Sequence, residues 1–328
     1  KTAYNADSLR LNLGAEASES PTAQIVPIQG EEFTRRILMP LDQNRFEFLT
    51  NQTSNLSAIL RLTVQQVEIE DNRKHLHLLR NFPSYREEYI LFRRYVQQLA
   101  YLYATNNLYI GPLIFEEHLE IPESHSVPET LFEPLLEGRH RLERVVGKGY
   151  VMSHTVVGRT VIINQNPSLL SNQERIDLNR RLESMKNNVV PIIIRPNGPG
   201  AVHVQSGAIR LRSFAQMMKF LGHGLDKEPE FEVEPDLTAG ILTGPSGQLI
   251  FDPPQTFTLS GGTSIPPKTF ISTEYKERAY WIEELERDSK NASRVAWDLE
   301  IFGLLYQIFQ LAVGEGTQTR GLPITIAK

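Results

Sequence analysis

Histidines offer the most direct route to chemistry in this sequence, because imidazole binds metals and exchanges protons near neutral pH. The 328 residues include eight of them. None lies in the His-Glu-x-x-His frame that places two imidazoles on one helix face around zinc. His75 and His77 would point the same way only on a strand, and their neighbours indicate a helix or a loop. Adjacent side chains in Glu116-Glu117-His118 do not share a face. We therefore expect no metal site.

Nucleophilic and cofactor-binding motifs are also missing. The chain has no cysteine, which excludes a thiolate nucleophile, a thiolate metal site and a disulfide. Ser246 lies in Gly-Pro-Ser-Gly, where the second glycine comes one residue too early for a nucleophile elbow. Lys148 lies between two glycines but lacks the rest of a phosphate-binding loop. We expect no catalytic residue and no cofactor. Any two of the 39 acidic residues could still converge in space, and the sequence leaves that open.

Charge and hydropathy narrow the classes of partner. The formal net charge is −5, without the concentrated basic stripe of a nucleic-acid-binding protein, so no nucleic acid is expected. The longest apolar run, 302–313, is interrupted by Gln307 and Gln310. This run is shorter than the ~18 residues that a membrane-spanning helix requires, so we predict no transmembrane span.

The elements that would position any site divide into two types. Apolar residues make up 40% of the chain and charged residues 22%, which is typical of a folded protein of this length. We predict an α+β fold, with a helical N-terminal half followed by a mixed α/β C-terminal half whose sheet is covered by two or more helices. The predicted parts are an extended N-terminal arm at 1–29, a mainly helical domain at 30–121 and a mixed α/β domain at 122–328.

Helical periodicity dominates residues 30–121. One predicted helix carries Leu56, Ile59, Leu60, Val64 and Val67 on one side. A stronger one follows Pro83, with apolar residues that step by four and three. Aromatic side chains could stack on bases or sugars, but a buried-face period favours packing in the core. The residues of this stripe are Tyr85, Tyr89, Phe92, Val96, Leu99 and Tyr103.

Short strands and capped helices follow. Pro191 predicts that the strand 189–195 runs at an edge or has a bulge, and Gly158 predicts a turn between two strands. The other predicted elements are strands at 113–121, 141–146, 150–157, 159–164 and 322–327, capping boxes at Ser171–Glu174 and Ser213–Gln216, a hairpin of 269–275 with 278–284, and a long helix from Val295 to Val313.

The segment 226–268 reads as a long, partly ordered loop rich in proline, glycine and acids. Acidic residues alternate in its first part, so in an extended chain they would share one face. Calcium needs oxygens that converge on one point, and a straight strand does not supply them. We interpret the row as an exposed edge that repels unwanted pairing. Its members are Glu228, Glu230, Glu232, Glu234 and Asp236.

Residues 8–17 alternate between apolar and polar side chains, which places Leu9, Leu11 and Leu13 on one face of a predicted strand. No nearby segment is an obvious partner. The strand would pair with a distant part of the fold or with another chain by strand addition. The alternative is a loosely ordered terminal arm. These three leucines are the candidate interaction residues.

Three blocks of sequence occur together in a recognisable order: 20–40, 209–222, and 279–282 with the later stretches 304–309 and 322–326. They resemble an uncharacterised family of envelope proteins of Gram-negative bacteria, which often carry lipoprotein-type signals. Residues 105–185 match only loosely. The family tends to have Tyr-Arg-Gly-Tyr-Trp-Phe-Tyr-Ile where this chain has Tyr-Lys-Glu-Arg-Ala-Tyr-Trp-Ile at 275–282.

The resemblance implies a location, either in the periplasm or attached peripherally to the outer membrane, and it assigns no catalytic residue. We therefore expect a non-enzymatic structural or interaction subunit of a cell-envelope assembly, such as a trans-envelope secretion system. Its partners would be other envelope proteins in a multi-subunit complex. The alternative is a periplasmic binding module or hydrolase that acts on glycan or peptide, with its site between the two halves near loop 226–268.

Overall fold

The computed structural model describes residues 30–53, 55–70, 75–122, 140–145, 149–200, 204–226, 229–235, 252–285 and 291–314. Leu9, Leu11 and Leu13 lie outside these ranges, and so does the predicted strand at 322–327. The predicted strand addition by residues 8–17 therefore stays a prediction.

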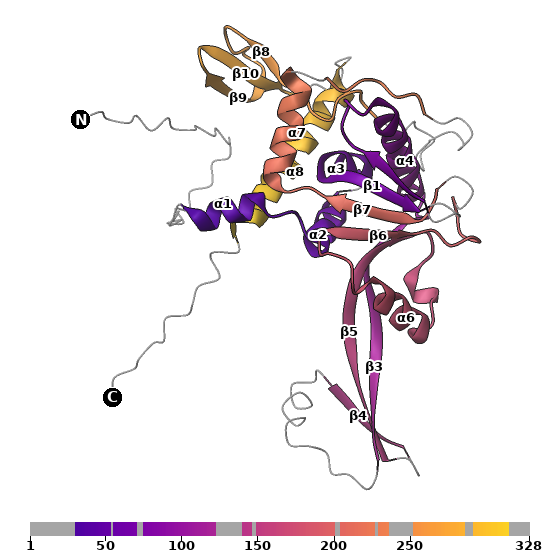
Figure 1. The fold of residues 1–328 in the computed structure, drawn as a ribbon. Helices are drawn as coiled ribbons and strands as arrows, with labels where there is room; N and C mark the ends of the chain where they lie inside the picture. Colours follow the sequence, from indigo (N-terminus) through magenta and orange to yellow (C-terminus); the bar gives the residue numbers. More distant parts are fainter. Residues whose placement is uncertain are drawn as a thin grey trace, which may run out of the picture.

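A mixed sheet forms the centre of the described part of the chain (Figure 1). Its seven strands are β1 (Val64–Glu70), β2 (Leu76–Arg80), β3 (Tyr109–Ile121), β4 (His140–Val145), β5 (Gly149–Ile163), β6 (Val189–Ile193) and β7 (Gly207–Leu211).

The strand order is β2-β1-β7-β6-β5-β3, and β4 pairs with the outer half of β5. All neighbours are antiparallel except β5 and β6, whose parallel pairing joins Ile162 to Ile192 and Ile163 to Ile193. Strands from both sides of residue 122 therefore contribute to one sheet. The division into domains at that residue stays a prediction.

The described helices pack on both faces of the sheet, except α1, which lies outside them against α7 and α8 (Figure 1). They are α1 (Glu31–Leu38), α2 (Gln43–Gln52), α3 (Leu56–Thr63), α4 (Arg86–Ala104), α6 (Asn172–Leu182), α7 (Phe214–Asp226) and α8 (Ala292–Gly314), with a short 3-10 turn η2 (Pro167–Leu169). None of those helices is long and apolar enough to cross a membrane.

Alternation along β5 assigns its side chains to two hydrophobic cores. Ile162 packs in the larger core with residues of α2, α3, α4, α7 and α8. Val161 and Ile163 point the other way, into a smaller core that α6 covers. The sheet thus has a thick helical layer on one face and a single helix on the other (Figure 1).

The prediction of a helical N-terminal half is wrong, because three strands of the mixed sheet, β1, β2 and β3, lie within it. The helix that begins at Leu56 ends at Thr63, and β1 follows directly. Val64 and Val67 fit a helical stripe, but Val67 and Ile69 also alternate as in a half-buried strand, and β-branched side chains favour that state. Pairing of β1 with both β2 and β7 decides between the two patterns.

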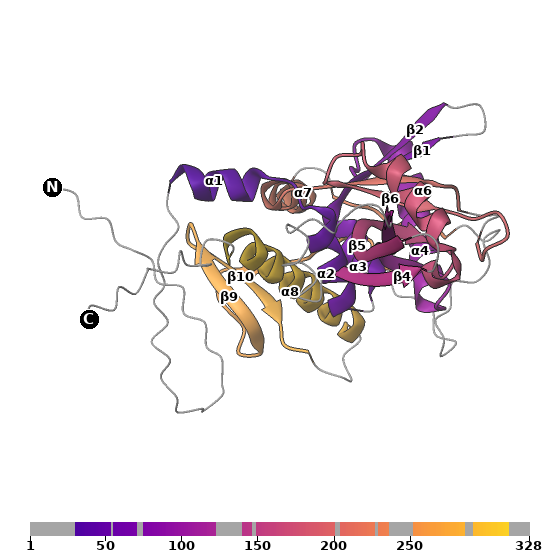
Figure 2. The same ribbon diagram turned by 90° about the horizontal axis from the view of Figure 1, so that it is seen from below.

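Several local predictions are confirmed. Ser171 and Glu174 form the capping box of α6. Ser213 and Gln216 make the same reciprocal pair of bonds at the start of α7. The predicted hairpin exists as β9 (Thr269–Tyr275) and β10 (Arg278–Glu283), which with β8 (Ser260–Gly262) form a small sheet beside α8 (Figure 2).

Two strand predictions are wrong. Gly158 lies inside one continuous strand, β5. A Cβ at this position would come within 2.4 Å of the Asn179 side-chain oxygen on α6. The glycine thus permits close helix packing and makes no turn. The strand predicted at 189–195 as an edge strand or a bulged one is β6, which lies between β5 and β7 and pairs with β7 without a register shift, so it is neither. Pro191 is tolerated because pairing with β5 is confined to Ile192 and Ile193.

A long arm projects from the body of the molecule (Figure 1). β3 and β5 pair from Tyr109 opposite Ile163 to Ile121 opposite Tyr150, and β4 continues the arm on the other side of β5. The α6 helix covers only the part of the arm near the body, where Leu113 and Phe115 are buried.

Candidate functional site

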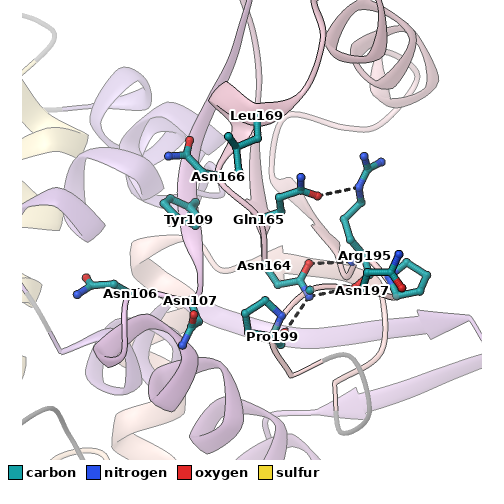
Figure 3. A pocket seen from close by; sticks show the side chains of 12 residues that line it. Asn106, Asn107, Tyr109, Asn164, Gln165, Asn166, Leu169, Arg195, Asn197 and Pro199 are labelled. Carbon is teal, nitrogen blue, oxygen red and sulfur yellow. Dashed lines mark hydrogen bonds between the residues drawn. The ribbon is translucent and has the colours of Figure 1, made fainter.

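A pocket of about 650 Å³ opens where three loops meet at one end of the sheet (Figure 3). This volume falls within the ~300–1,000 Å³ that small-molecule sites usually occupy. The loops follow α4, β5 and β6 in the chain. The pocket is lined by Asn106, Asn107, Tyr109, Asn164, Gln165, Asn166, Leu169, Arg195, Pro196, Asn197, Gly198 and Pro199.

Asn164 fixes the shape of the pocket. It is buried, and its Nδ2 donates to the carbonyl oxygens of Arg195 (3.2 Å) and Pro199 (2.8 Å). Its Oδ1 accepts from the backbone N–H of Arg195 at 2.8 Å. A Cβ at Gly198 would lie 2.5 Å from Asn164 Nδ2, so the loop can approach only as glycine. Asn164 therefore holds the wall in place and has no side-chain donor left for a ligand.

Two other amides present their donors to the pocket. Gln165 Oε1 accepts from Arg195 Nε at 3.1 Å, and Asn166 Oδ1 accepts from the backbone N–H of Ser168 at 2.9 Å. Both partners can only donate, so the bonded amide atom must be oxygen in each case. The remaining atom of each side chain is an NH₂ group. No acceptor for either NH₂ group occurs in the described part of the chain.

Arg195 adds positive charge to the same wall. Its Nη2 donates to Glu174 Oε1 at 3.2 Å, while no described residue accepts from Nη1. The backbone N–H of Ser171 is the main cause of a lowered pKa at Glu174, and the Ser171 hydroxyl and Arg195 add to it. Glu174 is therefore ionised at neutral pH and pairs with one side of the guanidinium, which leaves Nη1 for a ligand.

Amide side chains dominate the lining. Amide side chains neither take nor release protons at neutral pH, and none of the described lining residues is a carboxylate, an imidazole, an amine or an aliphatic hydroxyl. What the pocket offers instead is the NH₂ donors of Gln165 and Asn166, one guanidinium, and the amide oxygen of Asn107, whose Nδ2 donates to Thr105. Such a set complements a ligand rich in acceptors, above all one with a carboxylate.

Three of the histidines lie on neighbouring strands of the sheet. His77 lies on β2 opposite Ile69, so the prediction of a helix or loop there is wrong. His140 and His154 stack across β4 and β5 with ring centroids 4.8 Å apart, and Glu117 Oε2 is 3.7 Å from His154 Nε2. No group of three metal-ligating side chains forms among the residues that the structure describes. Lys148 and Ser246 lie outside those residues.

A buried ionic cluster, which the sequence did not predict, joins the loop after α7 to the helices. Arg61 on α3 pairs with Asp252 (2.8 Å) and Glu230 (3.3 Å), and Arg93 on α4 pairs with Asp252 at 2.7 Å. Tyr89 donates to Glu230 at 2.6 Å. The interpretation of Glu230 as part of an exposed acidic edge is therefore wrong, because Arg61 of α3 and Tyr89 of α4 hold it in the interior, where it is only 8% exposed.

The electrostatics of this cluster indicate a structural role. Burial alone would raise the pKa of Glu230, but Arg61, Tyr89 and the Thr256 N–H outweigh it and lower that pKa. Burial acts on Asp252 in the same way, and Arg61 and Arg93 again lower its pKa. Both carboxylates are therefore ionised, and their charge is already matched by arginines. They fit ion-paired anchors for the loop better than a general acid and base.

The sequence could not have located the pocket itself. Its amides come from three loops that are far apart in the chain, and an isolated asparagine in a loop normally indicates only a turn.

No family model matches this chain, and no curated protein or solved structure is significantly similar to it.

Proposed function

We propose that this chain is a non-enzymatic binding protein whose pocket takes a carboxylate-bearing segment of glycan or peptide. The observation that carries the proposal is the fixed orientation of Gln165 and Asn166, whose oxygens are occupied and whose NH₂ groups are not. Figure 3 shows Gln165 beside Arg195, where Nη1 adds a further donor, while Asn166 lies apart from both in the same pocket. A ligand carboxylate would accept from Gln165 and Arg195, and a second oxygen of the ligand would accept from Asn166.

A periplasmic setting suits this ligand class, because cell-wall glycan and peptide both carry carboxylates. The resemblance of blocks 20–40, 209–222 and 279–282 to envelope proteins supports that setting. The sequence predicted a site near segment 226–268. The pocket lies instead at one end of the sheet, and no residue of that segment lines it.

The test is a titration with short peptides and uronic-acid oligosaccharides, each compared with its methyl ester. The acid forms should bind, and esterification should weaken binding at least tenfold, because a charge-assisted hydrogen bond contributes ~1.5–3 kcal/mol. Gln165→Glu and Asn166→Asp retain the oxygen that is already bonded and replace the NH₂ donor with a charged acceptor. Each should weaken binding of the acid by tenfold or more.

Asn44→Asp is the matched control, because it adds the same charge at an exposed position on α2 outside the pocket. It should leave binding unchanged. Equal binding of acid and ester would contradict the proposal, as would unchanged affinity in both pocket variants. Circular dichroism of all three variants checks that the fold is retained.

A second candidate function is a structural subunit of a cell-envelope assembly, and the projecting arm favours it. Beyond α6, the outer edge of β3 has no strand partner in the described part of the chain. An edge of this kind accepts an added strand. The occupant we propose is residues 8–13 of a neighbouring copy, with Leu9, Leu11 and Leu13 on one face.

Charge supports that occupant. β3 carries Glu116, Glu117 and Glu120, so two β3 edges would repel each other. Residues 8–13 contain Arg10 and no acidic residue. A basic or neutral strand therefore complements this edge better than a second β3.

A further inference from the structure

A second cavity, of about 440 Å³, lies between α7 and the β1–β2 hairpin, remote in sequence from the amide pocket. Its described walls carry four basic or imidazole side chains and no aspartate or glutamate. They are formed by Gln65, Gln66, Arg80, Asn81, Phe82, Tyr85, Arg212, Gln216, Lys219, Phe220 and His223.

Arg212 is the buried charge of this wall. It is 3% exposed, and its described hydrogen bonds all go to the backbone carbonyl oxygens of Arg61, Leu62 and Asn81. Burial is the main cause of a pKa lowered to about 9, while Glu230 acts in the opposite direction. Arg212 is thus still a cation at neutral pH.

That charge is not balanced by its neighbours. In the part of the interior around Glu230, Arg61, Arg93 and Arg212 face the two carboxylates of Glu230 and Asp252, and those carboxylates are bonded to the other two arginines. One positive charge therefore remains beneath the cavity. An isolated buried charge is costly, and an anion in the adjoining cavity would offset it.

Groups on the exposed side of the cavity provide direct contacts. Gln216 Oε1 accepts from the Ser213 N–H at 2.9 Å, so its free atom is an NH₂ donor. Lys219, one turn along α7, is exposed and carries a mobile ammonium group. Arg80 is already partly neutralised by Glu88 at 3.1 Å.

Three aromatic rings, together with the amides of Gln65, Gln66 and Asn81, form the rest of the walls. Phe82, Tyr85 and Phe220 line the cavity, with the Arg80 guanidinium 4.3 Å from the Tyr85 ring centre and the Arg212 guanidinium 3.8 Å from that of Phe220. Flat apolar walls beside a cationic floor complement a flat ligand with one charged end.

We infer that this cavity is a binding site for an aromatic carboxylate, with the carboxylate at Lys219 and Gln216 and its charge stabilised by Arg212 beneath. The ring lies against Phe82 and Tyr85. This site is independent of the proposed glycan or peptide pocket, since the two share no lining residue.

Benzoate is the probe, with benzamide as its neutral isostere and acetate as the same anion without the ring. Titration of the full chain, followed by the backbone amide NMR shifts of α7, should give saturable binding of benzoate at millimolar concentration. Benzamide and acetate should each bind at least tenfold more weakly. Because Lys219 is exposed, added salt should weaken benzoate binding.

Lys219→Glu reverses the charge of the exposed contact and should abolish benzoate binding, and Lys219→Gln should weaken it three- to tenfold. Lys186→Glu is the control, because Lys186 is exposed and does not line the cavity. Three results would each overturn the inference. They are equal binding of benzoate and benzamide, unchanged benzoate binding by Lys219→Glu, and the absence of any α7 shift with benzoate even in low-salt buffer. Failure here leaves the ester comparison at Gln165 and Asn166 unaffected.

Discussion

The side chain of Asn172 pairs with the backbone of Glu116 as a neighbouring strand would. Its Oδ1 accepts from the Glu116 N–H, and its Nδ2 donates to the Glu116 carbonyl oxygen, each at 2.8 Å. The backbone of Glu116 must therefore face away from β5. Because these directions alternate along a strand, the backbone groups of His118 and Glu120 face the same outer edge.

Asn172→Ala should expose this edge at one residue. The amide of Glu116 then loses its acceptor, so its hydrogen exchange should become faster, while the amide of Leu113 in the core should be unaffected. The stability loss should be small, about 0.5–1.5 kcal/mol, because both backbone groups are solvent-accessible once the side chain is gone. Exchange measured by NMR checks the change, and an unaltered Glu116 rate would show that the pairing does not persist in solution.

Glu230→Gln should destabilise the fold strongly. It leaves Arg61 with one carboxylate partner fewer in the interior, and breaking one side of a buried ion pair costs ~3–5 kcal/mol. Glu232→Gln is the matched control, since Glu232 is exposed two residues away and should change the free energy of unfolding by less than ~0.5 kcal/mol. Denaturant unfolding compares the two variants. Equal stability would mean that the cluster does not anchor the loop.

The same carboxylates predict acid sensitivity. The pKa values of Glu230 and Asp252 are lowered from ordinary values of 4.5 and 3.8, so the unfolded chain binds protons more readily. Their contribution to stability is therefore fully present above about pH 5 and is lost as the pH falls below 4.5 towards the folded-state values. Unfolding free energies between pH 7 and pH 3 should show this decline. In Glu230→Gln the decline should be shallower, and an identical slope would contradict the assignment.

Local signals in the sequence predicted local structure well. The α8 stripe, the capping boxes at Ser171 and Ser213, and the β9–β10 hairpin depend on neighbours within a few residues, and all of them form. At Lys276 and Glu277 the turn requires positive φ angles of 49° and 61°, and the strands on both sides enforce them. The break from helix to strand at Val64 was missed because valine fits both patterns until β7 supplies a partner.

Features that depend on distant contacts could not be predicted. Glu230 belongs to an alternating acidic row whose pattern indicates an exposed strand. It is an interior anchor because it pairs with Arg61, which lies 169 residues earlier in the chain. Gln165 and Asn166 are donors to a ligand only because Arg195 and Ser168 already bond their side-chain oxygens. Arg195, the cation beside them, comes from a different loop. The donors that define the pocket are thus a product of tertiary structure.

Deletion of residues 1–20 should reduce self-association and leave the monomer folded, if residues 8–13 add a strand to β3 of a neighbouring copy. Light scattering after size exclusion measures the mass, and unfolding measured by circular dichroism checks the fold. Replacement of Leu9, Leu11 and Leu13 by serine should have the same effect as the deletion, because it removes the apolar face and retains the backbone. Replacement of Ser8 and Asn12 by threonine is the control and should preserve association. An identical mass for the full chain and the deletion would exclude this mode of assembly, and protection of the His118 and Glu120 amides in a monomer would instead assign the strand to its own chain.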